Sequence, residues 1–266
     1  MKKLRLDRLL VERGLAASRE RAQALILAGK VLVDEQKVEK AGASVGAEAK
    51  LRMLGEDLKY VSRGGVKLEA ALEHWRVEVT DRVCLDVGAS TGGFTDCLLQ
   101  RGAGRVIAVD TGYGQMDSRL RSHPRVRLLE RTNARYLKPE DVGERVEMAV
   151  MDVAFISATL VLPAVVRSCI AAWERGRDAR ATPGGKPALL ELVVLVKPQF
   201  EVGREKVGKG GIVRDADDQQ AAVEKVRRTV EALGGTEIEV MESPITGAEG
   251  NREFLLHARF HESRGK

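Results

Sequence analysis

Four charged side chains, spread widely along the chain, are of the types that could move a proton. Two are amines and two are carboxylates: Lys67, Asp152, Lys197 and Glu253. Two lysines placed between two carboxylates form a coupled set, in which each proton equilibrium depends on the neighbouring charges. Such a set could take a proton from a ribose 2′-hydroxyl while that oxygen attacks a methyl group in line. Singly, each residue reads more simply as a surface charge or as one half of an ion pair.

A glycine-rich turn indicates where these side chains would meet a ligand. The sequence from Val83 to Thr95, VCLDVGASTGGFT, predicts a buried strand, a turn and the start of a helix. Asp86 stands at the carboxyl end of that strand, where open α/β sheets bind ligands. A helix that begins near Phe94 points its free N–H groups at the ligand. The other candidate ligand-binding residues of the turn are Gly88, Ser90, Gly92 and Gly93.

The spacing within this turn narrows the choice of ligand. Its pattern, D-x-G-x-S-x-G-G, differs from the G-x-G-x-x-G of dinucleotide-binding folds. An acidic residue ahead of the glycines suits a ligand with a cationic or hydroxyl-rich end, such as S-adenosyl-L-methionine. A tight turn in another nucleotide-binding fold is the alternative, and the turn by itself leaves both open.

Two further polar residues follow later strands. Asp110 ends the next predicted strand, about twenty residues after the turn, where an acid can bind ribose hydroxyls. We favour this role over that of a helix-capping or turn aspartate because the glycine turn lies upstream. Asn133 could hydrogen-bond an adenine edge, or it could be a turn residue. We expect no metal ion at the site.

An alternating set of strands and helices must bring these residues together. Helices are expected over 66–74, 157–173 and 217–233, with a polar loop at 175–187. Strands that alternate with helices predict a Rossmann-like, doubly wound α/β sheet that ends in an antiparallel hairpin. Lys67 lies in the first turn of its helix, where a cation is either solvated or held for a purpose. The predicted strands are 83–87, 105–110, 126–129, 146–150, 189–196, 237–241 and 252–260.

The first sixty residues predict a separate small α+β domain. Helices are expected over Leu4–Arg13 and Arg19–Ala28, the second capped by Ser18, with a strand at Val31–Val33. Thirteen Lys or Arg stand against nine Asp or Glu here, so four of the chain's five net positive charges lie in this part. A basic helix face could lie against RNA phosphates, although charge alone favours a solvated face. The candidate RNA-binding residues are Arg5, Arg19, Arg21 and Lys30.

One pattern in this part is more specific than its charge. R-L-D-x-x-L, followed by S-R-x-x-A-x-x-x-I-x-x-G-x-V-x-V-D, runs from Arg5 to Asp34. It resembles the small RNA-binding module first named from a ribosomal small-subunit protein. The resemblance implies that the second helix and the following strand form the RNA face. We therefore expect a small RNA-binding domain over residues 1–60, ending in a short linker, and a second domain over 61–266.

Length and composition agree with a two-domain soluble chain. The 266 residues suffice for a full α/β domain and a smaller one, and a net charge of +5 permits a polyanionic partner without demanding one. Cys84, Cys97 and Cys169 form no paired framework, which indicates reduced thiols. The sequence shows neither a signal peptide nor an apolar run long enough to cross a bilayer. We expect a cytoplasmic protein with no membrane partner.

Longer segments of the second domain resemble a single family in their order along the chain. They are SRGGVKLEAAL, LDVGASTGGFTD, MDVAFIS, VKPQFE and GNREF. Together with the N-terminal pattern, they are similar to the haemolysin-A (TlyA) family. Members of that family join the small RNA-binding module to an FtsJ-like ribose methyltransferase domain. The resemblance covers essentially the whole chain.

This resemblance implies an activity and a site. It implies S-adenosyl-L-methionine as the methyl donor and cytidine 2′-hydroxyls of ribosomal RNA as acceptors, with ribosomal RNA or ribosomal subunits as partners. The family's Lys-Asp-Lys-Glu tetrad maps onto Lys67, Asp152, Lys197 and Glu253. Of the two lysines, we favour Lys197 as the base, because it follows a strand end beside Asp152.

Other classes of function compete with this one. A membrane-lytic haemolysin needs an amphipathic or spanning segment, and the sequence shows no convincing one. A catalytically idle RNA-binding protein predicts RNA binding without methyl transfer. A nicotinamide oxidoreductase requires a different glycine spacing and a site for hydride transfer.

Overall fold

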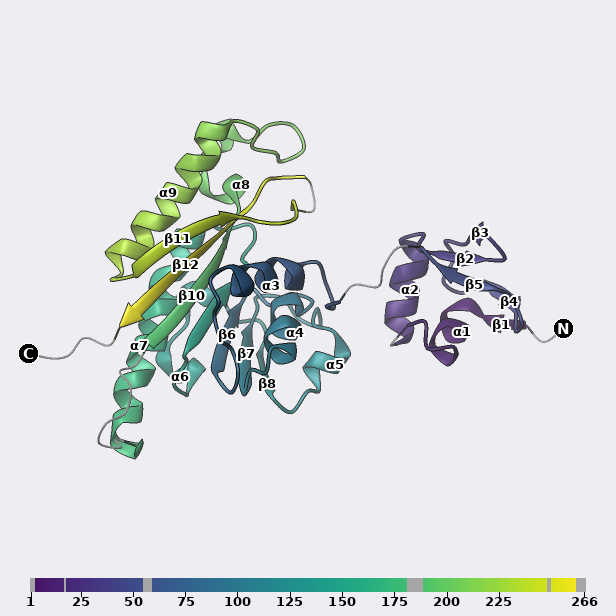
Figure 1. The fold of residues 1–266 in the computed structure, drawn as a ribbon, viewed down its shortest axis with the longest axis horizontal. Coiled ribbons are helices and arrows are strands. Elements are labelled where there is room, and N and C mark those ends of the chain that lie inside the picture. Colours follow the sequence, from purple (N-terminus) through teal and green to yellow (C-terminus); the bar gives the residue numbers. More distant parts are fainter. Residues whose placement is uncertain (1–2, 17, 55–58, 181–188, 248–249, 262–266) are drawn as a thin grey trace, which may run out of the picture. The chain divides into compact units, whose positions relative to one another are not determined.

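The computed structural model describes residues 3–16, 18–54, 59–180, 189–247 and 250–261, except for the side chains of 172–180. The chain divides into two compact units, Met1–Leu58 and Lys59–Lys266. Figure 1 shows both units. We call them the small unit and the large unit.

The small unit packs two helices against short antiparallel strands. Ser18 caps the second helix by accepting a hydrogen bond from the Arg21 N–H, as expected. The first helix is shorter than predicted, because Leu4 lies in a strand and pairs with Val45. The helices are α1 (Leu6–Glu12) and α2 (Arg19–Leu27), and the strands are β1 (Lys3–Arg5), β2 (Val31–Val33), β3 (Gln36–Lys37), β4 (Ser44–Gly46) and β5 (Leu51–Met53).

A seven-stranded sheet forms the centre of the large unit. Its strand order is β11-β12-β10-β9-β6-β7-β8, and only β12 runs antiparallel to its neighbours. This confirms the predicted doubly wound sheet with its terminal hairpin. The strands are β6 (Val83–Val87), β7 (Arg105–Val109), β8 (Val126–Leu129), β9 (Met148–Met151), β10 (Leu189–Val196), β11 (Thr236–Glu242) and β12 (Phe254–His261).

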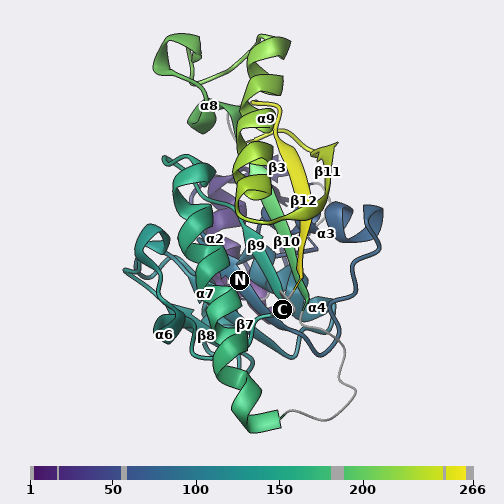
Figure 2. The same cartoon turned by 90° about the vertical axis from the view of Figure 1, so that its left-hand side faces the viewer.

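Helices cover both faces of this sheet, so its central strands are apolar on both sides. One face packs against α3, α4 and α5, and the other packs against α6, α7 and α9. Figure 2 shows α7 and α9 lying over the second face. The helices of the large unit are α3 (Gly64–His74), α4 (Gly93–Gln100), α5 (Ser118–Arg121), α6 (Pro139–Val142), α7 (Ala158–Arg180), α8 (Pro198–Glu201) and α9 (Ala216–Ala232), with 3₁₀ turns η1 (Ala134–Tyr136) and η2 (Arg204–Lys206).

Helix α7 is longer than the sequence indicated. The polar residues after Trp173 suggest a loop from 175, yet the helix continues to Arg180. Arginine and alanine are good helix formers, and a single internal glycine, Gly176, costs a helix only about 1 kcal/mol. The first part of the predicted loop is therefore wrong, and its remainder, 181–187, lies outside the described residues.

The topology brings the ends of several strands to one edge of the sheet. The parallel strands β6, β7, β9 and β10 all finish there. The antiparallel strand β12 starts at the same edge, since Phe254 pairs with Val196 at the end of β10. Residues just after β9 and β10 and just before β12 are therefore neighbours, although they are far apart in sequence.

Candidate active site

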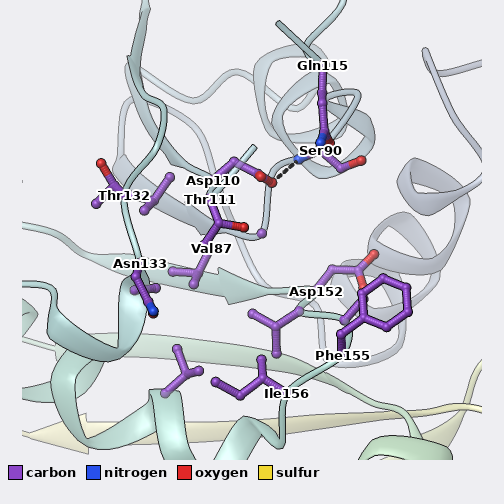
Figure 3. A pocket seen from close by; sticks show the side chains of 16 residues that line it. Val87, Ser90, Asp110, Thr111, Gln115, Thr132, Asn133, Asp152, Phe155 and Ile156 are labelled. Atoms are coloured by element: carbon purple, nitrogen blue, oxygen red, sulfur yellow. Dashed lines mark hydrogen bonds between the residues drawn. The ribbon is translucent and has the colours of Figure 1, made fainter. Parts of the chain in front are cut away.

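A first cavity of about 410 Å³ opens at this edge of the sheet (Figure 3). Its size falls in the range of about 300–1,000 Å³ that is usual for small-molecule sites. In Figure 3, Thr132 and Asn133 lie across the cavity from Asp152 and Phe155. The lining comes from the turn after β6, the loops after β7 and β8, and the loop after β9. The predicted ligand-binding residues among the lining are Gly88, Ser90, Asp110 and Asn133.

Gly88 is required by the close approach of two loops. Its φ is +84°, and a Cβ atom there would lie 2.4 Å from the backbone oxygen of Asp152. Any other residue would push the loop after β9 away from the turn after β6. The glycine therefore sets the width of the first cavity on this side.

Asp110 organises the opposite side of the same turn. One carboxylate oxygen accepts the N–H of Ser90 at 2.7 Å, and the other accepts the N–H of Gly112 at 2.6 Å. Each carboxylate oxygen has a further lone pair, so Asp110 can still accept hydroxyl groups from a ligand. The residue thus both closes the loop and faces the first cavity.

Asn133 was expected either to contact an adenine edge or to be a turn residue, and its position allows both. Its side-chain oxygen accepts the N–H of Arg135 at 3.0 Å and caps η1. The same residue lines the first cavity, and Figure 3 shows its side chain at the wall. Its amide nitrogen is not needed for the cap and can contact a ligand.

Asp86 takes a different place from the one we expected. It is fully buried and lines neither this cavity nor the second one described below. Thr95 donates a hydrogen bond to one carboxylate oxygen at 2.6 Å, and the other oxygen has no partner among the described residues. Burial raises the pKa of the Asp86 carboxyl to about 7, and the nearby Asp152 adds to the rise. The structure therefore gives Asp86 no direct ligand contact. Instead, it ties the end of β6 to the first turn of α4.

A second cavity, of about 310 Å³, lies beside the first. All four charged residues identified from their types line it: Lys67, Asp152, Lys197 and Glu253. The turn residues Gly93 and Phe94 also line it, whereas Gly92 lines neither cavity. Gly92 adopts φ +97°, and a Cβ there would lie 2.4 Å from the Leu120 side chain.

The four charged residues form two ion pairs. Lys67, in the first turn of α3, pairs with Glu253, just before β12. This pair is almost fully buried, with side-chain exposures of 9% and 3%. Lys197, after β10, lies 2.5 Å from a carboxylate oxygen of Asp152, after β9, and this pair is more open. The helix-start lysine is thus held by a partner rather than solvated.

The two cavities share part of their walls. Gly88, Ser90, Asp152 and Ala154 line both. A group held in the first cavity can therefore reach a group held in the second across Asp152. The arrangement suits a transfer between two ligands, with two amines and two carboxylates around the acceptor.

One short segment holds the loop 152–157 that forms this shared wall. Lys197 pairs with Asp152 at its start, and the Phe200 ring lies 5.5 Å from the Phe155 ring, centroid to centroid. At its end, the Glu201 carboxylate accepts the Ala158 N–H at 2.6 Å and the Ser157 hydroxyl at 2.5 Å. Phe155 adopts φ +64° and its side chain is 93% exposed. Such a backbone conformation persists only where its surroundings impose it.

Two of the candidate RNA-binding residues of the small unit, Arg5 and Arg19, are arranged around one buried carboxylate. Asp7 accepts hydrogen bonds from the guanidinium groups of Arg5, at 2.8 and 3.1 Å, and Arg19, at 3.1 Å. The Arg5 guanidinium holds the pKa of the Asp7 carboxyl well below its usual range. Both arginine side chains remain about half exposed. Arg21 and Lys30 are partly buried.

Our sequence reasoning missed several residues of the site. Ser62 and Arg63 line the second cavity just before α3, and both belong to the segment SRGG that carried the resemblance. Phe155 likewise belongs to MDVAFIS. The first cavity adds Ile156, which also belongs to MDVAFIS, and Thr111, Gln115 and Thr132, for which no sequence signal stands out. In the described residues, no group of three or more His, Cys, Asp or Glu could hold a metal ion, and no helix there is long and apolar enough to span a membrane.

Comparisons with known proteins agree with this geometry. The family model for FtsJ-like methyltransferase matches residues 60–260, and the model for the S4 domain matches residues 4–51. The chain is 45% identical over 264 residues to the 16S/23S rRNA (cytidine-2'-O)-methyltransferase TlyA of Mycobacterium tuberculosis, covering 99% of this chain and 92% of the relative. It is 36% identical over 257 residues to Hemolysin A of Brachyspira hyodysenteriae, covering 96% and 99%.

A solved structure has a similar fold. A candidate hemolysin from Streptococcus thermophilus matches with a TM-score of 0.69 at 39% identity, covering 99% of this chain and 90% of that one. The family model spans well over half of the chain, and the relatives cover nearly all of it. The chain therefore belongs to the FtsJ-like methyltransferase family and carries an S4 domain at its N-terminal end.

Proposed function

We propose that this protein transfers a methyl group from S-adenosyl-L-methionine to a ribose 2′-hydroxyl of ribosomal RNA, and that the modified nucleotide is a cytidine. One observation carries the proposal. A small-molecule cavity and a cavity lined by two amines and two carboxylates share Asp152 as a common wall. The relatives named for cytidine-2'-O methylation of rRNA support the choice of acceptor.

The first cavity fits the donor by its chemistry. When bound there, S-adenosyl-L-methionine supplies a methyl group on a cationic sulfur. Asp110 places acceptor oxygens where ribose hydroxyls can bind, and Asp152 adds negative charge on the opposite wall. The Asn133 amide can bind an adenine edge. The carboxylates thus complement a ligand that carries both positive charge and hydroxyl groups.

The second cavity fits the acceptor ribose. A 2′-hydroxyl is a weak acid, so its proton must leave as the new bond to carbon forms. Lys197 stands at the shared wall beside Asp152, and this placement supports it, in its neutral amine form, as the group that takes the proton. Lys67 is paired with Glu253 deeper in the wall, and we assign it to orienting the ribose.

The small unit supplies a way to hold the RNA. S4 domains bind RNA, and Arg5 and Arg19 are half exposed over one buried carboxylate. Asp7 fixes the direction of both guanidinium groups while cancelling only one of their two charges. We propose that this face contacts phosphates of the ribosomal RNA.

The test is single-turnover methyl transfer by Lys197→Ala and Lys67→Ala variants. General acid–base groups contribute about 10²–10⁴-fold to rate, so Lys197→Ala should lose at least about 100-fold. Donor affinity by calorimetry and RNA affinity by filter binding should stay close to those of the wild type. Mapping the product to a ribose 2′-oxygen by mass spectrometry completes the assignment.

A matched control is available in the same unit. Lys206 lies 2.5 Å from Asp218 in a lysine–aspartate pair that lines neither cavity. Lys206→Ala should keep the wild-type rate. If both lysine variants of the site also keep near-normal single-turnover rates, the tetrad does not perform the chemistry.

A further inference from the structure

Exposed aromatic side chains and arginines gather on the loops that border the first cavity. Tyr113 and Tyr136 are 66% and 67% exposed. The Arg131 guanidinium lies 4.4 Å from the centre of the Tyr113 ring, and that of Arg135 lies 5.8 Å from the Tyr136 ring. Arg121 approaches the Tyr113 ring from 5.9 Å. We call these five residues the arginine–tyrosine rim.

None of the five rim residues lines the first cavity, but they lie next to residues that do. Tyr113 falls between Thr111 and Gln115, and Arg131 directly precedes Thr132. Six large apolar or aromatic side chains are exposed in the described part of the chain, and four of them are on segments that border this cavity. They are Tyr113, Tyr136, Phe155 and Leu160. Apolar exposure on the large unit is therefore concentrated around one opening, which marks a binding surface.

The rim is held in shape before any partner arrives. The Glu130 carboxylate accepts the N–H of Gly114 at 2.6 Å and pairs with the Arg121 guanidinium. This fixes the Tyr113 loop against the turn that follows β8. Arg131 adopts φ +54°, a left-handed conformation that a residue of its size rarely takes. Backbone strain of this kind collects at ligand sites.

Charge decides which class of partner suits the rim. Residues 110–138 hold seven Lys or Arg against three Asp or Glu, an excess of four within a chain whose net charge is +5. Guanidinium groups and exposed aromatic rings together bind phosphates and stack on bases. A protein partner also uses tyrosine and arginine, but it does not require such a charge excess.

We infer that the arginine–tyrosine rim is a second RNA-contacting surface, on the large unit, which binds nucleotides that flank the methylated one. Arg131 and Arg135 contact phosphates, and the faces of Tyr113 and Tyr136 stack on unpaired bases. The inference rests on the proposed function, because it takes RNA to be the substrate whose ribose enters the second cavity.

The experiment uses the full chain and an in vitro transcript of ribosomal RNA, with binding measured between 50 and 200 mM salt. The variants are Arg131→Ala with Arg135→Ala, Tyr113→Ala, and Tyr113→Phe. Each phosphate contact that is lost should lower the slope of log affinity against log salt by about 0.7–0.9. The slope for the double arginine variant should therefore be shallower by about 1.4–1.8. Tyr113→Ala should lower the affinity for RNA by roughly fivefold or more, because a stacking face is lost. Tyr113→Phe keeps the ring and should bind RNA as the wild type does.

The control is a double variant with the same loss of charge at the far end of the sheet. Arg227 and Arg228 lie on α9, each in an ion pair with a glutamate one turn away. Their replacement by alanine should leave the slope unchanged. Donor affinity should be unchanged in every variant, since none of these residues lines the first cavity.

Two results would overturn the inference. One is an unchanged slope and affinity in the rim variants. The other is an equal loss in the rim and α9 variants, which would indicate a general charge effect. If naked RNA is bound normally while methylation of whole ribosomal subunits falls, the rim contacts a protein instead. A wild-type chain that binds RNA but transfers no methyl group would contradict the proposed function. The binding measurements would still test whether the rim contacts RNA.

Discussion

At the scale of single residues, Asp86 shows how burial changes the role of a carboxylate. It stands at the strand end where a ligand contact was expected, yet no part of it is exposed. One of its oxygens is held by Thr95 and the other has no described partner. Burial raises its pKa to about 7, whereas an aspartate in the unfolded chain titrates near 3.9. Between these two pKa values, the Asp86 carboxyl is protonated in the folded unit and ionised in the unfolded chain.

The sign of the pH effect follows from this shift. Between about pH 4 and pH 7 the unfolded chain has lost the Asp86 proton while the folded chain keeps it, so stability from this residue falls as pH rises. Asp86→Asn removes the ionisation, so the variant should be more stable than the wild type at pH 8 and lose that advantage towards pH 4. A pKa difference of about three units sets an upper bound of about 4 kcal/mol on this gain in the free energy of unfolding.

Tryptophan fluorescence during urea unfolding measures this effect, because Trp75 and Trp173 both belong to the large unit. Asp217→Asn, at an exposed position of α9, is the matched control. A stability difference for Asp86→Asn that does not change with pH would contradict the assignment.

At the scale of elements, the segment 197–201 and the loop 152–157 act as one piece. The segment carries the proposed base, Lys197, and four residues later it carries Glu201, which is only 6% exposed. The Glu201 carboxylate accepts the first N–H of α7, that of Ala158, where the helix dipole favours negative charge. Lys225 of α9 donates to the backbone oxygen of Glu201 at 2.7 Å and fixes the segment from the other side. Glu201 is therefore a positioning residue for the shared wall.

Glu201→Ala should lower turnover by about 10–100-fold, because a displacement near 1 Å costs about this much in a positioned reaction. Donor affinity should weaken several-fold, while RNA affinity should remain unchanged. Glu201→Gln keeps an acceptor oxygen for the Ala158 N–H and should recover most of the activity.

A second buried glutamate provides the comparison. Glu191, near the start of β10, is 3% exposed and binds His257 at 2.5 Å and Arg259 at 3.1 Å. Glu191→Ala should cost stability without a selective loss of turnover per folded molecule. Equal activities in the two alanine variants, at equal folded fraction, would show that Glu201 is only structural.

At the scale of the whole molecule, charge and chemistry are divided between the two units. The small unit, residues 1–58, holds twelve Lys or Arg against nine Asp or Glu, so it carries three of the five net positive charges, whereas both cavities lie in the large unit. Tyr60 is 2% exposed, and Gln100 donates a hydrogen bond to the Lys59 oxygen, so these residues belong structurally to the large unit. The division implies that RNA capture and donor binding can be separated by truncation.

A chain that lacks residues 1–54 but keeps Lys59 and Tyr60 should bind the donor as the full chain does. Its methylation of ribosomal RNA at 0.15 M salt should fall by about tenfold or more, because phosphate contacts are lost. In the full chain, Arg5→Ala with Arg19→Ala should weaken RNA binding. Arg8→Ala should not, since the Arg8 guanidinium pairs with Glu12 rather than with Asp7. If the truncated chain modifies RNA as well as the full one, the small unit is not the RNA anchor.

The sequence by itself determined the order of the seven sheet strands and the main helices of the large unit, and the kind of fold. Strands 126–129 and 189–196 were predicted with the bounds that the structure shows, because apolar runs between polar turns depend on local pattern alone. The glycine turn likewise identified the ligand-binding edge of the sheet, since glycines with positive φ leave a local signature. The chemistry of the four charged residues needed the family resemblance as well, because each one alone resembles a surface charge.

Tertiary structure alone decided which charged residues pair and which face a cavity. The pairs Lys67–Glu253 and Lys197–Asp152 depend on β12 running antiparallel beside β10, and strand register across the sheet leaves no local trace in the sequence. Burial is also a non-local property. Asp86 and Asp110 both end a strand, yet packing against α4 encloses the first while the second lines a cavity. Side chains that are far apart in sequence become neighbours only through packing, and their roles follow from that packing.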